Sequence, residues 1–211
     1  MTRGLAVVLT LVVLAFAIFA GWHSNQLTDY FPRDLQSQTS DCEVAPGRWE
    51  RQTVQDEYEV EWFRGELSAL GEPSLSRLPA SKASSVRFTW LRSFHDPVVV
   101  RVDTVDGVRT LTAKQHPKGY SGDIPRDREV VRVLTDGEVP ALDAVLEDTG
   151  QFERPSNACR CCADGAQWIV ESADGRHGYR YRNIQSPRSG PERRLGLHLL
   201  GLTGWSFERV Y

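Results

Sequence analysis

The sequence predicts an α+β fold: an N-terminal transmembrane helix followed by one mainly antiparallel-sheet domain with two or three packed helices. Three observations lead to this prediction. A long apolar segment opens the chain, short segments with alternating apolar residues follow it, and two of the turns between them contain Asp-Gly. Because tight turns rather than helical crossovers join these segments, we expect neighbouring strands to run antiparallel.

The apolar segment Gly4–Trp22 is the first predicted element. It contains no charged residue, and as a helix it is about 28 Å long, close to the roughly 30 Å of a bilayer's hydrocarbon core. We expect residues 1–24 to be an uncleaved signal anchor. Since Arg3 precedes the segment, the N-terminus is placed in the cytoplasm and the remainder in the periplasm, as in a single-pass protein of a bacterial inner membrane. The alternative is a cleaved signal peptide with Ala15-Phe16-Ala17 as its recognition site.

The remainder of the chain divides into a stalk and a domain. Residues 25–48 are polar, contain proline and lack periodicity, so we expect a stalk between the membrane and the domain. The extracytoplasmic α+β domain then covers residues 49–211. At its start, Val54–Leu70 fits two interpretations: Tyr58, Val60 and Trp62 alternate as in a strand, whereas Phe63, Leu67 and Leu70 have helical spacing. The length of the segment favours a helix.

Alternating apolar residues predict strands along the middle of the chain. The expected strands are Val86–Leu91, Val98–Asp103, Val108–Lys114, Glu129–Leu134, Ala166–Ser172 and Tyr179–Ile184. Asp106-Gly107 joins the second of these to the third, and Asp174-Gly175 joins the last two. Asp-Gly is typical of hairpin turns because glycine adopts the positive φ that such turns require.

Two further helices have boundary signals in the sequence. Thr135 and Glu138 stand three residues apart, as in a capping box, and Gly150 ends the helix that they begin. Pro191–Leu202 begins with proline, which favours the first turn of a helix. This segment is apolar around most of its circumference and too short to cross a bilayer, so we expect it to pack against the sheet.

Composition limits the classes of function. The 211 residues include 25 Lys+Arg and 28 Asp+Glu, which gives a net charge of −3, and 40% of the residues are hydrophobic. These values exclude a polytopic membrane protein and a wholly disordered chain. The acidic balance and the expected location argue against nucleic acid as a partner. All basic residues after residue 150 are arginine, which is typical of a surface that binds anions or of GC-rich codon usage.

Four cysteines predict a covalent cross-link. Cys42 stands alone, whereas Cys159, Cys161 and Cys162 lie close together. In an oxidising compartment, a disulfide from Cys42 to this cluster would close a loop of more than a hundred residues. Disulfide bonding is the favoured interpretation, and no cofactor is expected. The alternatives are free or partly paired thiols and a thiolate site for Zn²⁺ or Cu(I).

Three residues are candidates for acid–base catalysis. His95 precedes Asp96 in a predicted turn, and a histidine beside a carboxylate can act as a base or a ligand. Asp164 and Glu171, which stand seven residues apart across a loop and a predicted strand, form a candidate carboxylate pair. The simpler explanation is a solvated histidine and two unrelated carboxylates. The sequence contains no nucleophile elbow, phosphate-binding loop, dinucleotide fingerprint or zinc-protease motif.

Three stretches of the sequence together resemble a group of bacterial proteins. They are SVRFTWLRSFHDPVVVRVD (Ser85–Asp103), DGAQWIVE (Asp164–Glu171) and SPRSGPERRLGLHLLGLTGW (Ser186–Trp205). The combination resembles uncharacterised, membrane-anchored envelope proteins, and the resemblance covers roughly the last 130 residues. It implies no activity and transfers no catalytic residue. The Cys-Arg-Cys-Cys run is not part of the shared pattern.

The same stretches contain candidate binding residues. Arg92 and Arg101 are expected at one end of the sheet, where Gln167, Glu171 and Arg182 would meet them from the other hairpin. An inward arginine needs a carboxylate partner, so an ion-pair network that supports the fold is the favoured interpretation. The alternative is a pocket for an anionic small molecule.

These observations predict a periplasmic binding domain that one helix holds to the membrane, with a protein of the envelope as its partner. One alternative is a hydrolase- or transferase-type enzyme that uses carboxylate or histidine chemistry, and another is a thiol-based metal or redox site. Convergence of His95, Asp164 and Glu171 around a hollow favours the enzyme. A surface patch without a deep pocket favours binding.

Overall fold

The computed structural model describes residues 30–77, 83–116, 128–160 and 164–211. The expected membrane anchor over residues 1–24 lies outside these ranges, and so do Cys161 and Cys162. Within the described ranges, no helix has both the length and the apolar character needed to cross a membrane.

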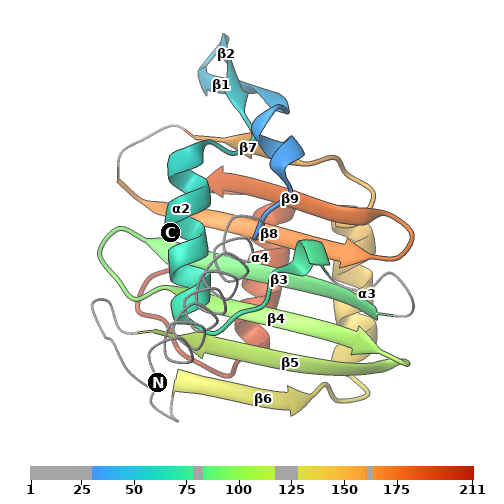
Figure 1. Cartoon of the computed structure of the whole chain (residues 1–211). Helices are drawn as coiled ribbons and strands as arrows, with labels where there is room; N and C mark the ends of the chain where they lie inside the picture. The colour runs from blue at the N-terminus through green and yellow to red at the C-terminus, as the bar shows by residue number, and fades with distance from the viewer. Residues whose placement is uncertain (1–29, 78–82, 117–127, 161–163) are drawn as a thin grey trace, which may run out of the picture.

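A seven-stranded sheet forms the centre of the fold (Figure 1). Its strand order is β6-β5-β4-β3-β8-β9-β7, and all pairings are antiparallel except that of β7 with β9. The strands are β3 (Ala83–Arg92), β4 (Val98–Val105), β5 (Val108–Gln115), β6 (Glu129–Val133), β7 (Asn157–Cys159), β8 (Ala166–Asp174) and β9 (Gly178–Gln185). The predicted α+β class with a mainly antiparallel sheet is confirmed.

The two predicted Asp-Gly turns differ in detail. Asp106 and Gly107 have φ values of 48° and 81° and join β4 to β5 as predicted. β8 and β9 also form the predicted hairpin, but there the positive φ of 70° belongs to Gly178 rather than to Gly175. This turn is longer because the side chain of Asp174 accepts main-chain hydrogen bonds from the residues that follow it.

Three helices cover the two faces of the sheet. α2 (Glu57–Ala69) lies on one face, and α3 (Glu138–Thr149) and α4 (Pro191–Leu202) lie on the other (Figure 1). Thr135 and Glu138 exchange the side-chain and main-chain hydrogen bonds expected of a capping box. They do so in the turn before α3, whose N-cap is Gly137 and which begins at Glu138. Gly150 ends α3 with a φ of 57°.

Side-chain alternation along the strands divides the core into two layers. In β3, Val86, Phe88 and Trp90 belong to the layer beneath α3 and α4, whereas Leu91 belongs to the layer beneath α2. Both layers are closed to solvent at their centres. The same alternation places Arg87, between Val86 and Phe88, on the α2 face of the sheet.

The polar stretch before the domain has structure from Tyr30 onward, which differs from the expected stalk over residues 25–48. A 3-10 turn, η1 (Arg33–Gln36), is followed by β1 (Thr39–Ala45), which pairs with β2 (Arg48–Thr53) in a separate hairpin. Phe31 and Leu35 are buried in the layer beneath α2. Polarity misled the prediction because most side chains of this hairpin are exposed.

A disulfide fastens this hairpin to the large sheet. Cys42 of β1 is bonded to Cys159 of β7 across 117 residues of sequence. The predicted disulfide between Cys42 and the later cysteine cluster is confirmed. Beside it, the side chain of Gln52 in β2 makes two 2.9 Å hydrogen bonds with the main chain of Arg160.

Candidate functional site

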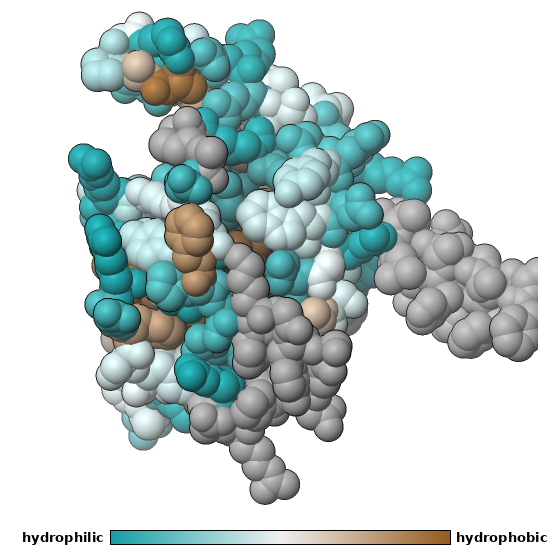
Figure 2. Space-filling view, turned by 90° about the vertical axis from the view of Figure 1, so that its left-hand side faces the viewer, coloured by the Kyte–Doolittle hydropathy of each residue, from teal (hydrophilic) through white to brown (hydrophobic). Residues whose placement is uncertain are grey.

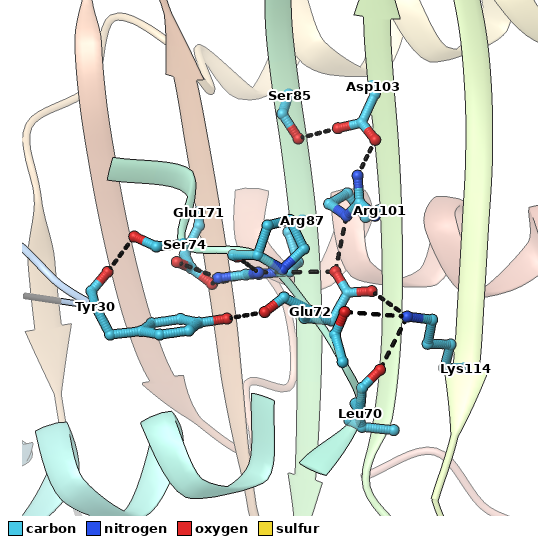
Figure 3. Close-up of polar contacts among 12 residues, drawn as sticks. Tyr30, Leu70, Glu72, Ser74, Ser85, Arg87, Arg101, Asp103, Lys114 and Glu171 are labelled. Atoms are coloured by element: carbon cyan, nitrogen blue, oxygen red, sulfur yellow. Dashed lines mark hydrogen bonds and ion pairs between the residues drawn. The ribbon is translucent and has the colours of Figure 1, made fainter. Parts of the chain in front are cut away.

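A network of buried charges lies on the α2 face of the sheet (Figure 3). It joins β3, β4, β5 and β8 to the segment that follows α2. Its charged members are Glu72, Arg87, Arg101, Asp103, Lys114 and Glu171. The three cations are matched by three carboxylates, so the network carries no net charge.

Arg87 and Glu171 form one half of the network. Nε and Nη2 of Arg87 donate to the two carboxylate oxygens of Glu171, both at 2.7 Å. The side chains are 0% and 1% exposed. Burial by itself lowers the pKa of Arg87, but Glu171, Tyr30 and Glu72 together outweigh this effect and raise the pKa above its usual range. Tyr179 also donates to Glu171, at 2.8 Å.

Glu72 is the central residue of the second half of the network. Arg87 and Arg101 are direct neighbours across β3 and β4, and their like charges need a carboxylate between them. Glu72 Oε2 lies 2.7 Å from Arg101 Nε, and Glu72 Oε1 lies 3.1 Å from Lys114 Nζ. Burial by itself raises the pKa of Glu72, but Arg101, Arg87 and Lys114 together lower it below its usual value.

Tyr30 connects the beginning of the described chain to this network. Its hydroxyl donates to the main-chain oxygen of Glu72 at 2.6 Å, and Ser74 Oγ donates to the main-chain oxygen of Tyr30 at 2.5 Å. Burial raises the pKa of Tyr30 to about 12. Since its charges are matched and its central side chains are closed to solvent, this network holds the segment after α2 on the sheet and offers no open binding site.

The structure does not bring the five candidate binding residues together. Arg101, Gln167 and Glu171 face α2, whereas Arg92 and Arg182 lie on the opposite face of the sheet. The expectation that they meet is therefore wrong. Arg92 and Arg101 point to opposite faces of β3 and β4, and Arg182 lies on β9, which β8 separates from β3. Gln167 Oε1 is buried without a hydrogen-bond partner in the described part of the chain.

Arg182 is part of a separate buried cluster beneath α4. Its Nη2 donates to Gln151 Oε1 at 2.5 Å, and its Nε lies 3.2 Å from Glu192. Burial lowers the pKa of Arg182 to about 10, and the nearby charge of Arg154 adds to this effect. Because Arg154 also pairs with Glu192 at 2.8 Å, the cluster fastens α4 to the sheet.

Two hollows meet at the turn between β3 and β4. This turn lies at the end of the sheet that is on the left of Figure 1 and faces the viewer in Figure 2. The hollows have volumes of about 400 Å³ and about 360 Å³ and share Arg92, Phe94 and His95 as lining residues. The surface at this end is mainly hydrophilic, with isolated hydrophobic patches (Figure 2).

The larger hollow, here called the basic hollow, contains three guanidinium groups. Arg92, Arg128 and Arg209 line it, together with Asp96 and Glu208. Among the residues that the structure describes, no carboxylate oxygen lies within 4 Å of these three guanidinium groups. This arrangement contrasts with Arg87, whose charge is matched by Glu171.

The smaller hollow contains two of the candidate catalytic residues. His95 and Asp164 both line it, and Glu66 of α2 contributes a second carboxylate. Glu171 does not belong to it, because Glu171 is buried in the network beneath α2. The Nδ1 atom of His95 lies 2.7 Å from the hydroxyl of Tyr211, which leaves the other ring nitrogen for any further contact.

Tyr211 is held in place by two tryptophans. Its main-chain oxygen accepts hydrogen bonds from Trp168 Nε1 at 2.8 Å and from Trp90 Nε1 at 3.1 Å. The segment before it contains Phe207 and Arg209, which line the basic hollow. This segment is therefore fixed against the sheet at the point where it forms one wall of the hollow.

Sequence reasoning identified some of these residues and missed others. Arg87 could have been found, because the alternation of Val86 and Phe88 places it inside the opposite layer, where it requires a carboxylate. Arg128 and Arg209 carried no such signal. They are far apart in sequence and meet only because the sheet end and the final segment fold together.

The described part of the chain gives little support to a thiol-based metal or redox site. The disulfide occupies Cys42 and Cys159, and no group of three or more His, Cys, Asp or Glu side chains in the described ranges is placed to hold a metal ion. Cys161 and Cys162 lie outside those ranges.

No protein-family model matches the sequence, and a comparison with curated proteins finds no match.

Proposed function

We propose that this protein is a membrane-anchored, periplasmic domain that binds a protein of the bacterial envelope through the sheet end at the β3–β4 turn. The observation that carries the proposal is the position of Phe94, whose side chain is 74% exposed between two hollows lined by charged groups. Exposed aromatic rings and arginines are the residue types that contribute most to protein–protein interfaces.

The location is supported by two features. Gly4–Trp22 has the length and composition of a single membrane-spanning helix. The disulfide between Cys42 and Cys159 is typical of proteins in oxidising compartments such as the periplasm. Both features agree with the resemblance of the sequence to membrane-anchored envelope proteins.

Binding is favoured over catalysis because the candidate catalytic groups do not form one set. Glu171 is neutralised by Arg87, and only His95 and Asp164 share a hollow. That shared hollow keeps hydrolase- or transferase-type chemistry as a second proposal. Loss of a measured hydrolytic activity in both His95→Ala and Asp164→Asn, but not in Glu57→Gln at an exposed position outside both hollows, would favour it.

Affinity capture from detergent-solubilised membranes tests the binding proposal. The full chain and the variant Phe94→Ala are compared, with Tyr58→Ala on α2 as the control, since Tyr58 is 72% exposed and lies outside both hollows. We expect the full chain and Tyr58→Ala to retain the same envelope protein and Phe94→Ala to lose it. Retention of that protein by all three would overturn the proposal.

A further inference from the structure

The basic hollow has an excess of positive charge that the described residues do not neutralise. Arg92, Arg128 and Arg209 contribute three positive charges, and Asp96 and Glu208 contribute two negative ones. These five side chains together carry a net charge of +1. A group with one negative charge balances this lining, whereas a doubly charged phosphate would leave a net negative charge in the hollow.

Arg92 is a fixed cation at the inner wall of the hollow. Its Nε and Nη2 donate to the main-chain oxygen of Asp96, at 3.1 and 2.5 Å, and its guanidinium lies 4.3 Å from the ring centre of Trp90. These contacts hold the guanidinium plane but supply no opposite charge. Burial lowers the pKa of Arg92 and the charge of Arg128 adds to this effect, whereas Tyr211 and Asp96 act in the opposite direction without cancelling it. An anion in the hollow would offset the repulsion between Arg92 and Arg128.

The walls of the hollow favour an anion carried by a peptide. Phe94 and Phe207 provide aromatic surface beside the guanidinium groups, and Gln115 accepts a 2.8 Å hydrogen bond from Arg128 that orients this arginine. A volume of about 400 Å³ accommodates a carboxylate together with a neighbouring side chain.

We propose that the basic hollow binds a carboxylate group of a peptide segment of the partner protein, with Arg92, Arg128 and Arg209 as its recognition residues. This inference rests on the proposed function, since it names the chemistry by which that surface recognises its partner. The carboxylate belongs either to an acidic side chain or to a C-terminus. In both cases the guanidinium groups donate hydrogen bonds to a monoanion beside an aromatic wall.

Fluorescence anisotropy with labelled peptides tests this proposal on the full chain in neutral detergent. The first probe is acetyl-Ala-Ala-Glu-Phe-Ala-amide. The second has Gln in place of Glu, and the third is the Gln peptide with a free C-terminal carboxylate. Inorganic phosphate serves as a competitor. We expect at least one of the carboxylate peptides to bind about ten-fold or more tightly than the uncharged Gln peptide, and whichever does so identifies the source of the carboxylate.

Matched variants locate the binding in the hollow. Arg128→Gln and Arg209→Gln each remove one exposed cation of the hollow, and Arg48→Gln removes one exposed cation of the β1–β2 hairpin. We expect the first two variants to reduce the carboxylate preference about ten-fold and the third to leave it unchanged. Because all three side chains lie at the surface, the variants are expected to fold normally.

Several results would overturn the proposal. One is equal affinity for the charged and uncharged peptides, or no binding up to about 1 mM peptide. Another is a carboxylate preference that survives in both hollow variants. Displacement of the peptides by phosphate at lower concentrations than by unlabelled carboxylate peptide would assign the hollow to phosphate groups instead. If these tests fail while Phe94→Ala still loses its captured protein, the proposed function stands and only the ligand chemistry is wrong.

Discussion

Arg87 of β3 and Glu171 of β8 meet in a two-point ion pair, with both N···O distances at 2.7 Å and both side chains closed to solvent. The pair connects two central strands beneath α2. Through Glu72 it also fixes the segment that leads from α2 into β3. Arg101 and Glu171, which the sequence suggested as site residues, instead belong to a buried network that stabilises the fold.

The first prediction concerns this pair. Replacing only one partner leaves an uncompensated buried charge, so Arg87→Met or Glu171→Leu is expected to lower the free energy of unfolding by about 3–5 kcal/mol. The double variant is expected to cost less than the sum of the two single variants, because it removes both charges. Guanidinium chloride unfolding of the four proteins measures this coupling. Additive costs would contradict the ion pair.

The second prediction is a pH dependence that arises from Glu72. Its pKa in the folded protein lies below the unfolded value of about 4.5, so ionised Glu72 stabilises the fold. This contribution is complete above pH 4.5 and is lost as the pH falls through the folded pKa. Glu72→Gln should therefore be less stable than the unmodified protein at neutral pH, and the difference should shrink in acid. A difference that does not change with pH would contradict the assignment.

The third prediction concerns the disulfide between Cys42 and Cys159. It closes a loop with a sequence separation of 117, for which chain entropy gives an upper estimate of roughly 4–5 kcal/mol. The variant Cys42→Ser/Cys159→Ser is expected to lose up to that amount of stability. A reducing agent should destabilise the unmodified protein but not the variant. The measurement is chemical unfolding with and without reductant, and equal sensitivity of both proteins would contradict the prediction.

The fourth prediction compares two glycines of α4. A Cβ at Gly196 would lie 2.6 Å from Trp168 Cζ3 and 2.9 Å from Phe88 Cε2, whereas a Cβ at Gly201 meets nothing within 4 Å. Gly196→Ala is expected to cost about 1–3 kcal/mol through overpacking. Gly201→Ala should be neutral or stabilising by up to about 1 kcal/mol, because alanine favours a helix over glycine. Thermal unfolding of the two variants distinguishes them, and similar melting temperatures would contradict this packing.

Much of the sheet could be predicted from the sequence because its signals are local. The alternation of Val98, Val100 and Val102, and the Asp106-Gly107 turn after them, define a strand and its hairpin without reference to the rest of the chain. The proline at the start of Pro191–Leu202 and the capping pair Thr135 and Glu138 define two helices in the same way.

The parts of the structure that the sequence did not predict depend on contacts between segments that are distant in the chain. Residues 30–48 form η1 and β1 because Phe31 and Leu35 reach the core beneath α2, and this burial is not visible in a polar sequence. The expected meeting of Arg92 with Arg101 and Arg182 failed for a different reason. Arg92 and Arg101 lie on neighbouring strands but point to opposite faces, whereas Arg182 lies on β9, which β8 separates from β3. The order of the strands in the sheet, which sets this separation, is not a local feature of the sequence.

The basic hollow was missed for the same physical reason. Arg92 ends β3, Arg128 precedes β6, and Arg209 belongs to the segment held by Trp90 and Trp168. Only the folded sheet end places the three guanidinium groups around one space, so no local pattern could have identified them together.

A charge reversal in the basic hollow tests the central claim most directly. Arg128→Glu replaces a positive charge of the hollow by a negative one, and Arg48→Glu makes the same change on the β1–β2 hairpin. The measured quantity is the amount of the captured envelope protein that each variant retains from solubilised membranes. If this sheet end is the binding surface, Arg128→Glu loses the partner and Arg48→Glu keeps it. Equal retention by both variants would contradict the account.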